Sequence, residues 1–420
     1  MRTRFYNAQV LTMKDFNIFS GEVWVEDNKI IYVGKAKDSS FCFDREIDVQ
    51  NNLIMPGFID AHTHSGMTFL RSMADDMPLQ QWLNEKVFPI EAKLTQDDIY
   101  YFSKLAILEY LTSGITTNFD MYLNPEAIIK ASLDMKYRTV LCGAVNDFCL
   151  SVEDVERCFK EYNQENSLIS YILGFSHEYT NSKEKIQQVA ALSHKYKAPV
   201  FTHLSETEYE VSTCKEKTGL SPAEYLCDLG VYDYGGGAFH CVHMSEHDLD
   251  LFQEKHLNIV TNPASNLKLA SGIAPIQAML QRNINVCLGT DGAASNNCLD
   301  MFREMFLVTG LAKYKNCDAS AVDAYEVLKM ATINGAKALN LNCGVLEAGK
   351  LADLIILDLH QPNMQPMNNI AKNIVYSGSK SNVKCTMVNG EILYEDGQFH
   401  VGFDIASLYD EIQKRVERLK

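Results

Sequence analysis

The chain has 420 residues, of which 46% are hydrophobic, and it exceeds the roughly 250–300 residues over which a single core grows, so we expect a large domain and a smaller one. Acidic residues outnumber basic ones by 54 to 38, giving a formal net charge of −16, and no basic run is present, which argues against nucleic acid and anionic membrane surfaces as partners. We expect a cytoplasmic protein with reduced cysteines, because the sequence has no signal-peptide pattern, no apolar stretch of about 18 residues and no paired spacing among its 12 cysteines.

The two ends of the chain show the same pattern of short β-like segments separated by turns. Residues 1–54 contain short apolar segments with turns, including a hairpin signal at Asp27-Asn28, and residues 345–402 resume this pattern in "GKLADLIILDL" and "CTMVNGEILYEDGQF". We expect both segments to meet in one small composite β-sandwich domain. A C-terminal helix is predicted over 403–420 from helix-like spacing of Ile405, Leu408, Ile412, Val416 and Leu419.

Between these ends, residues 55–344 alternate strand-like runs with helical stretches. The predicted strands are 57–62, 115–120, 138–145, 169–175, 198–203, 237–241, 257–261 and 284–289. Eight such units over about 250 residues predict an α/β fold of the TIM (β/α)8 barrel type. A doubly wound open sheet is the alternative, but no Gly-x-Gly-x-x-Gly follows the first strand.

Polar side chains follow four of these strands at the point where each strand ends. They are His62 and His64 after the first strand, His203 and Glu206 after the fifth, His240 after the sixth and Asp291 after the eighth. In a barrel the carboxyl ends of the strands form the active-site face, so we expect these side chains to converge. The H-x-H spacing also places both imidazoles on one face of a strand, because strand side chains alternate with period two.

The residue types predict a metal centre with a proton-transfer group. Three imidazoles and a carboxylate suit one divalent ion, Zn²⁺ first and Fe²⁺ as the alternative, with a position left for water; the predicted ligands are His62, His64, His203 and Asp291. Glu206 is the candidate that passes a proton to a substrate nitrogen, while Asp291 and His240 activate the water. His243 is predicted to be structural. Standing alone, Glu206 would be read as a solvated first-turn glutamate and Asp291 as a helix N-cap.

These motifs, in this order, resemble the amidohydrolase superfamily over nearly the whole chain. The resemblance is carried by "PGFIDAHTH" (56–64), "HLSE" (203–206), "NPASNLKLASGIAPI" (262–276), "LGTDGAASNN" (288–297) and "GKLADLIILD" (349–358). The fourth strand contains no lysine, which the binuclear members use to bridge two metals, so the resemblance implies a single ion. "PLQQWLNEKVFPIEAK" (78–93) further resembles the methylthioadenosine/S-adenosylhomocysteine deaminase and chlorohydrolase branch. That resemblance implies that Glu91 holds ribose hydroxyls, Trp82 forms a wall of the pocket and His177 contacts the substrate.

Two departures from that branch concern the substrate. His177 lies one position later than the usual Pro-His-x-x-Tyr-Thr, because Ser176 takes the matching slot. No basic residue stands between Arg138 and Arg157, where relatives that bind homocysteine-type substrates have an arginine for the carboxylate. The resemblance therefore implies a hydrolytic deaminase of an adenine-type nucleoside, a small-molecule substrate, with methylthioadenosine, S-adenosylhomocysteine, adenosine or a relative as candidates. A guanine, purine or pterin deaminase, a triazine-type chlorohydrolase and a non-catalytic scaffold remain alternatives, and a homo-oligomer stays open.

Overall fold

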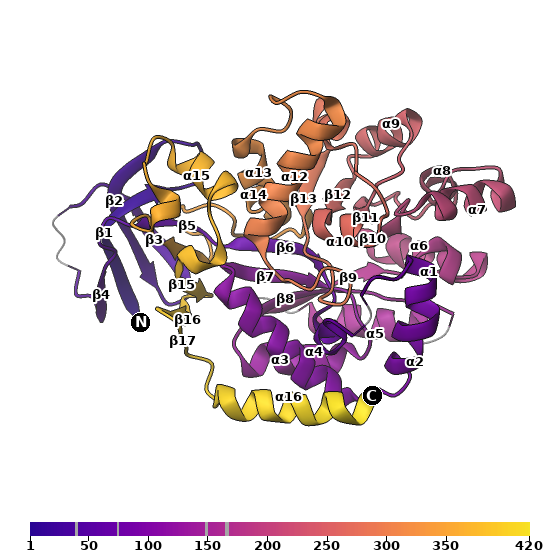
Figure 1. Ribbon diagram of the computed structural model, residues 1–420, viewed down its shortest axis with the longest axis horizontal. Coiled ribbons are helices and arrows are strands. Elements are labelled where there is room, and N and C mark those ends of the chain that lie inside the picture. The colour runs from indigo at the N-terminus through magenta and orange to yellow at the C-terminus, as the bar shows by residue number, and fades with distance from the viewer. Residues whose placement is uncertain (38–40, 74, 148–149, 164–167) are drawn as a thin grey trace.

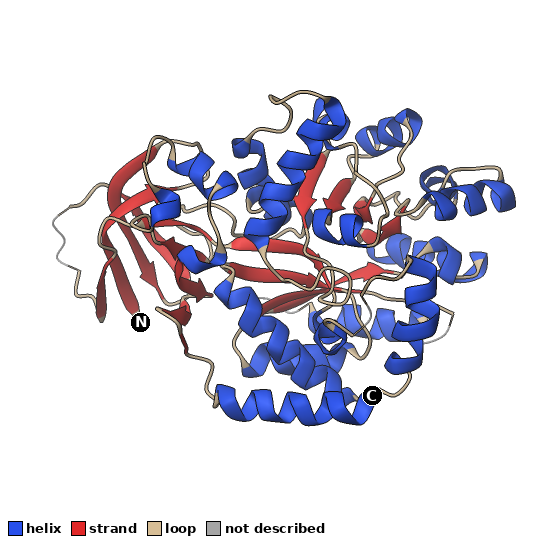
Figure 2. Ribbon diagram, in the orientation of Figure 1, coloured by secondary structure: helices blue, strands red, loops and turns tan. Residues whose placement is uncertain are grey.

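The computed structural model describes residues 1–37, 41–73, 75–147, 150–163 and 168–420. Eight parallel strands form the central sheet, and their order in space equals their order in the chain (Figures 1 and 2). They are β6 (Phe58–Thr63), β7 (Ile115–Asp120), β8 (Arg138–Cys142), β9 (Ile169–Gly174), β10 (Val200–Leu204), β11 (Gly236–His240), β12 (Asn258–Thr261) and β13 (Asn285–Leu288). The predicted barrel is confirmed.

The first and last strands of this sheet are joined beyond their ends. The backbone N–H of Asp291 donates to the carbonyl of His62 at 2.9 Å, and the backbone N–H of Thr290 donates to the Asp60 carboxylate at 2.8 Å. These bonds nearly close the barrel, and they do so at the position where β6 and β13 deliver their site residues.

Helices cover the outside of the barrel. They are α3 (Gln96–Thr112), α4 (Pro125–Asp134), α5 (Val152–Tyr162), α6 (Lys183–Tyr196), α7 (Glu208–Thr218), α8 (Pro222–Asp228), α9 (Glu246–Glu254), α10 (Pro263–Lys268), α11 (Ile276–Gln281), α12 (Met301–Asn316), α13 (Ala324–Met330) and α14 (Ile333–Ala338). The strands they cover are almost completely buried, as is usual for parallel strands packed on both faces. Inside the barrel, the rings of Phe119, Phe201 and Phe239 contact one another with centroids 5.1 to 5.9 Å apart.

The two ends of the chain meet in a second sheet, as predicted, seen at the left of Figure 1. Its N-terminal strands are β1 (Arg2–Leu11), β2 (Ile18–Glu26), β3 (Lys29–Gly34), β4 (Arg45–Asp48) and β5 (Leu53–Pro56). Its C-terminal strands are β14 (Leu354–Leu357), β15 (Val383–Val388), β16 (Glu391–Glu395) and β17 (Gln398–Phe399). The two sets join where β5 pairs antiparallel with β14. Asp27, in the predicted hairpin turn between β2 and β3, has a positive φ of 52°.

A buried ion pair ties the barrel to this sheet. Arg138, at the start of β8, donates from Nε to Asp353 at 2.9 Å and from Nη2 to the other carboxylate oxygen at 3.3 Å, and Asn389 also accepts from it at 3.0 Å. The pair lies just before β14, so the start of a barrel strand is fixed to the second sheet.

The remaining helices are α1 (Leu79–Trp82), α2 (Phe88–Glu91), α15 (Ile370–Tyr376) and α16 (Ile405–Leu419). Helix α16 runs along α3 (Figure 1), and Arg415 joins the two through Asp98 at 3.0 Å and Asp97 at 2.9 Å. Within the described ranges, no helix is both long and apolar enough to cross a membrane.

Candidate active site

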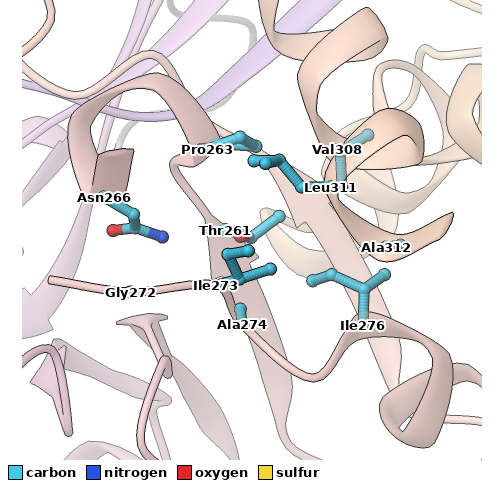
Figure 3. A pocket seen from close by; sticks show the side chains of 10 residues that line it. All are labelled: Thr261, Pro263, Asn266, Gly272, Ile273, Ala274, Ile276, Val308, Leu311 and Ala312. Atoms are coloured by element: carbon cyan, nitrogen blue, oxygen red, sulfur yellow. The ribbon is translucent and has the colours of Figure 1, made fainter. Parts of the chain in front are cut away.

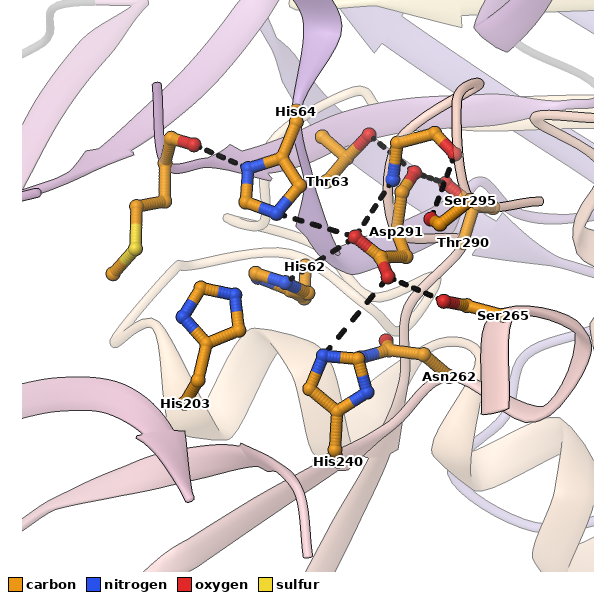
Figure 4. A network of polar contacts seen from close by, with 12 residues as sticks. His62, Thr63, His64, His203, His240, Asn262, Ser265, Thr290, Asp291 and Ser295 are labelled. Carbon is orange, nitrogen blue, oxygen red and sulfur yellow. Dashed lines mark hydrogen bonds and ion pairs between the residues drawn. The ribbon is translucent and has the colours of Figure 1, made fainter. Parts of the chain in front are cut away.

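Four histidines and one aspartate converge at the carboxyl ends of the barrel strands (Figure 4). The ligand atoms of His62, His203 and His240 lie within 4.8 Å of one another, and so do those of His62, His64 and Asp291. His62 belongs to both groups and therefore lies at their centre. The structure thus brings together the four predicted ligands and His240.

Hydrogen bonds at Nδ1 orient three of the four imidazoles. His64 faces the carbonyl of Met121, His203 faces the carbonyl of Ser176 at 2.8 Å, and His240 faces Oδ1 of Asn266 at 2.8 Å. Each acceptor assigns the ring proton to Nδ1, which leaves the Nε2 lone pair for the centre of the cluster. Outer-shell bonds of this kind set the tautomer and direction of metal-binding histidines.

His62 is oriented by packing instead. Its ring stacks on Phe239 with centroids 3.8 Å apart, and it is completely buried. Neither of its ring nitrogens has a hydrogen-bond partner among the described residues. Leaving a buried polar atom unpaired costs about 1–3 kcal/mol, so these nitrogens point to a ligand in the centre of the cluster.

Asp291 completes the cluster and lies close to three of its histidines. One carboxylate oxygen lies 3.2 Å from Nε2 of His64 and 3.7 Å from Nε2 of His62, while the other lies 3.9 Å from Nε2 of His240. Two ligand atoms that each lie about 2.0–2.2 Å from one ion are separated by about 3–4 Å. Ser265 donates to the second oxygen at 2.5 Å and fixes the carboxylate plane.

The charges of this cluster are mutually adjusted. Burial alone would raise the pKa of Asp291, but the hydrogen bond with His64 together with the charges of His64, His240 and His62 holds that pKa well below its usual range. Burial would lower the pKa of His64, but the hydrogen bond and charge of Asp291, the carbonyl of Met121 and the charge of Asp120 together raise it to about 9. For His62 and His203, burial dominates and keeps the pKa well below 6.5, so both rings are neutral. A divalent metal ion binds neutral imidazoles and ionised carboxylates. His62, His203 and Asp291 already have these forms, whereas His64 would release its proton on binding the ion, and the cluster fits one such ion.

Glu206 is buried close enough to this cluster for the charges of His240 and Asp291 to act on its carboxyl group. Ser271 donates to its Oε1 at 3.3 Å, and burial raises the pKa of its carboxyl group. Nε2 of His243 donates to the backbone carbonyl of Ser271 at 2.7 Å, so it holds the loop that carries this hydroxyl. A carboxyl group that retains its proton more readily than usual beside a metal cluster can exchange protons with a substrate.

The three residues expected to contact substrate lie in different settings. Glu91 accepts from the hydroxyl of Tyr122 at 2.6 Å, and the Tyr122 ring lies 6.3 Å from that of His64, so Glu91 faces the site. His177 stacks on His203 with centroids 4.2 Å apart, despite its shifted position in the sequence. Trp82 is buried within a hydrophobic cluster, and its indole N–H has no partner among the described residues.

Several partners in this site were not identified from the sequence. Ser265, Asn266 and Ser271 all lie within the quoted "NPASNLKLASG" motif, which marked the segment but assigned no roles inside it. The carbonyls of Met121 and Ser176 carry no sequence signal, because any residue supplies a backbone oxygen.

A cavity behind Asn266 does not serve as the substrate pocket. It lies between the segment from Gly272 to Ile276 and helix α12, with apolar walls from Val308 and Leu311 (Figure 3). Its volume of about 10 Å³ admits no more than about one water molecule. A cavity of this size is too small for a nucleoside.

A parallel barrel with imidazoles and a carboxylate at the carboxyl ends of its strands defines a metal-dependent hydrolase barrel. Residues 53–393 match the model of the amidohydrolase family, and the chain belongs to that family.

Relatives cover nearly the whole chain. It is 37% identical over 424 residues to 5-methylthioadenosine/S-adenosylhomocysteine deaminase of Thermoanaerobacter pseudethanolicus, covering 98% of both chains. It is 38% identical over 388 residues to 5'-deoxyadenosine deaminase of Methanothermobacter thermautotrophicus, covering 91% of both chains. Among solved structures, an adenosine deaminase from Xanthomonas campestris with bound zinc matches with a TM-score of 0.94 at 29% identity, over 99% of this chain and 98% of that one.

Proposed function

We propose that this protein hydrolytically removes the amino group from the adenine ring of a nucleoside and releases ammonia. The observation that carries the proposal is the buried Glu206 carboxyl group beside a cluster of imidazoles and Asp291 on the active-site face of the barrel. The names of the relatives, which are deaminases of 5'-modified adenosines, support the same reaction class.

In this proposal His62, His64, His203 and Asp291 hold a single Zn²⁺ ion, the metal present in the similar adenosine deaminase structure. Zinc supplies Lewis-acid chemistry that lowers the pKa of a bound water to about 7. Fe²⁺ is the alternative for the same ligands.

The side chains of the chain itself handle the protons. Asp291 accepts the proton of the attacking water, since its carboxylate is ionised and held by Ser265. His240, fixed by Asn266, hydrogen-bonds and orients that water. Glu206 gives a proton to the ring nitrogen next to the carbon under attack, and burial favours the protonated form that this step needs.

Substrate contacts come from the other side of the site. One oxygen of Glu91 accepts from Tyr122, and the carboxylate is proposed to accept from the ribose hydroxyls as well. His177, stacked on His203, and Trp82 are proposed to line the space for the nucleoside.

The 5' substituent of the preferred substrate is proposed to be uncharged. The arginines that flank the third barrel strand, and Arg71 after the first, all bind carboxylates of the protein: Arg138 binds Asp353, Arg157 binds Glu126, and Arg71 binds Glu109. A substrate carboxylate would have to compete with these groups. We therefore expect methylthioadenosine, 5'-deoxyadenosine or adenosine to be better substrates than S-adenosylhomocysteine.

The test is ammonia release by zinc-loaded protein from a panel of these four nucleosides, with guanine, a pterin and a triazine for comparison. Turnover of the neutral nucleosides above all others is expected. Ammonia release from only guanine or the pterin, or chloride release from a chlorinated triazine, would overturn the substrate class. A strong preference for S-adenosylhomocysteine would overturn the proposal of an uncharged 5' group.

A further inference from the structure

Behind Glu206 lies a second buried glutamate that holds the backbone rather than the substrate. Glu210, in the first turn of α7, accepts from the backbone N–H of Ser205 at 2.5 Å and from that of Glu206 at 2.9 Å. Thr207 caps the same helix by accepting from the Glu210 N–H at 3.2 Å. A first-turn glutamate in a Thr-x-x-Glu pattern ordinarily returns to the N-cap N–H, whereas Glu210 reaches the two residues before it.

These bonds secure a strained backbone turn. Ser205 has a positive φ of 50°, a conformation that non-glycine residues adopt at a cost of about 1 kcal/mol or more. The turn separates His203, at the end of β10, from Glu206. Because Glu210 binds the N–H groups of the two peptides that flank Ser205, it determines the direction in which Glu206 leaves the strand.

The carboxyl group of Glu210 also meets that of Glu178, which follows β9. Both side chains are buried, and their carboxyl groups lie within hydrogen-bonding reach of each other. Oε2 of Glu178 is buried without a donor among the described residues. Two carboxylates have no proton to share, so one of these groups must be protonated for the contact to be favourable. Glu210 accepts two backbone N–H bonds, and the pKa of Glu178 is raised further than that of Glu210, which makes Glu178 the donor.

We propose that Glu178 and Glu210 share one proton, and that this acid pair is a positioning device that clamps the end of β9 to the turn carrying Glu206. Glu178 adjoins His177, which stacks on His203, so the clamp fixes two substrate-facing side chains relative to each other. The catalytic consequence rests on the role of Glu206 in the proposed deamination; the shared proton itself does not.

The surroundings favour the shared proton. Among the described residues, the other titratable groups that act on the pair are a carboxyl, two thiols and three phenols, none of them cationic: Glu206, Cys214, Cys241, Tyr179, Tyr225 and Tyr232. Lys215 and Lys217 also lie on α7, but both are exposed. Burial, followed by the charge of Glu210, raises the pKa of Glu178 to about 9, and burial, followed by the charge of Glu206, raises that of Glu210 to about 7.

The sign of the resulting pH dependence is fixed. Between its ordinary pKa of 4.5 and its folded pKa of about 9, Glu178 is protonated in the folded protein and ionised in the unfolded chain. Unfolding therefore releases a proton, and the contribution of Glu178 to stability declines as the pH rises through this window. Glu178→Gln keeps an N–H donor for Glu210 but cannot titrate.

The first experiment compares melting temperatures of wild type and Glu178→Gln from pH 5 to 9. As the pH rises, the melting temperature of wild type should fall relative to that of the variant by about 1.5 °C per pH unit. This value applies if wild type releases one proton on unfolding as a cooperative unit of this size. Glu208→Gln, an exposed change on the same helix, should run parallel to wild type. A constant difference between Glu178→Gln and wild type would overturn the shared proton.

The second experiment tests positioning with Glu210→Gln. In this variant the amide NH₂ faces a backbone N–H and one of the two bonds is lost, so Glu206 should be misplaced and kcat for ammonia release should fall about 10- to 100-fold. The kcat of Glu178→Gln should stay within about twofold of wild type. Wild-type kcat in a folded Glu210→Gln protein would overturn the clamp. If wild type releases no ammonia from any nucleoside while the melting curves behave as expected, the proposed function fails and the shared proton stands.

Discussion

Replacing Glu206 by glutamine separates its role in proton transfer from its role in structure. The amide has the same size and can still accept from Ser271, but it has no proton to give to a ring nitrogen. General acid–base groups supply about 10²–10⁴ in rate, or about 2.7–5.5 kcal/mol of activation free energy. The hydrogen bond from Ser271 is 3.3 Å long, so its change affects stability by at most about 1 kcal/mol. We therefore expect kcat to fall by at least 100-fold with no loss of folding.

Two further measurements sharpen this test. Glu206 is not in either group of converging ligand atoms, so the variant should retain one metal ion per chain by elemental analysis. Burial raises the pKa of Glu206, which means that its ionised form is costly to bury, and the melting temperature of Glu206→Gln at neutral pH should equal or exceed that of wild type. Glu208→Gln is the matched control and should keep wild-type kcat. A Glu206→Gln protein with kcat within tenfold of wild type would refute the reasoning and move the proton role to Asp291 or His240.

Three other predictions follow from the same geometry. Removing the metal with a chelator should abolish ammonia release and lower the melting temperature, because binding at 100 times Kd stabilises by about 2.7 kcal/mol; added Zn²⁺ should restore both, and an unchanged melting temperature would contradict a metal site in the cluster. Glu91→Gln should lower kcat/KM for nucleosides about 10- to 100-fold, while Tyr122→Phe has a smaller effect; indifference of every nucleoside would exclude ribose binding by Glu91. Arg138→Met should cost about 3–5 kcal/mol of unfolding free energy by leaving Asp353 unpaired, against less than about 1 kcal/mol for the exposed Lys136→Met, and equal denaturant midpoints for the two variants would contradict this.

The barrel could be predicted from the sequence because its signals are local. Each buried strand is a short apolar run next to a periodic helical stretch, and the predicted strands overlap all eight observed ones. The joining of the chain ends was predicted only from the short apolar segments and turns that both ends share. Which strands pair there could not be predicted. Strands β5 and β14 pair with Ile54 opposite Ile356, and no local pattern specifies a contact between residues so far apart in the sequence.

The candidate site, like the fold, could be predicted only in part. Histidines and acidic residues at strand ends are visible in a sequence, since their side chains carry the chemistry. The groups that orient them are not: His203 is directed by the backbone carbonyl of Ser176, and His240 by Asn266 on a different segment. Nothing in the sequence distinguishes Glu210 from an ordinary first-turn glutamate of a helix, and only its contacts with Ser205 and Glu206 give it another role.

The backbone at the strand ends explains why these supporting contacts are needed. Ser205, His240 and Asp291 all have positive φ values, 50°, 68° and 60°; His240 is the last residue of β11, and the other two follow the ends of β10 and β13. Such residues cost about 1–3 kcal/mol each and persist only where neighbouring structure holds them. Here the Asp291 N–H is bound by the carbonyl of His62, and the Ser205 N–H by Glu210. The hydrogen bonds that pin these turns also set where the Asp291 and Glu206 carboxylates lie, so a substitution that releases one turn should cost activity before it costs the fold.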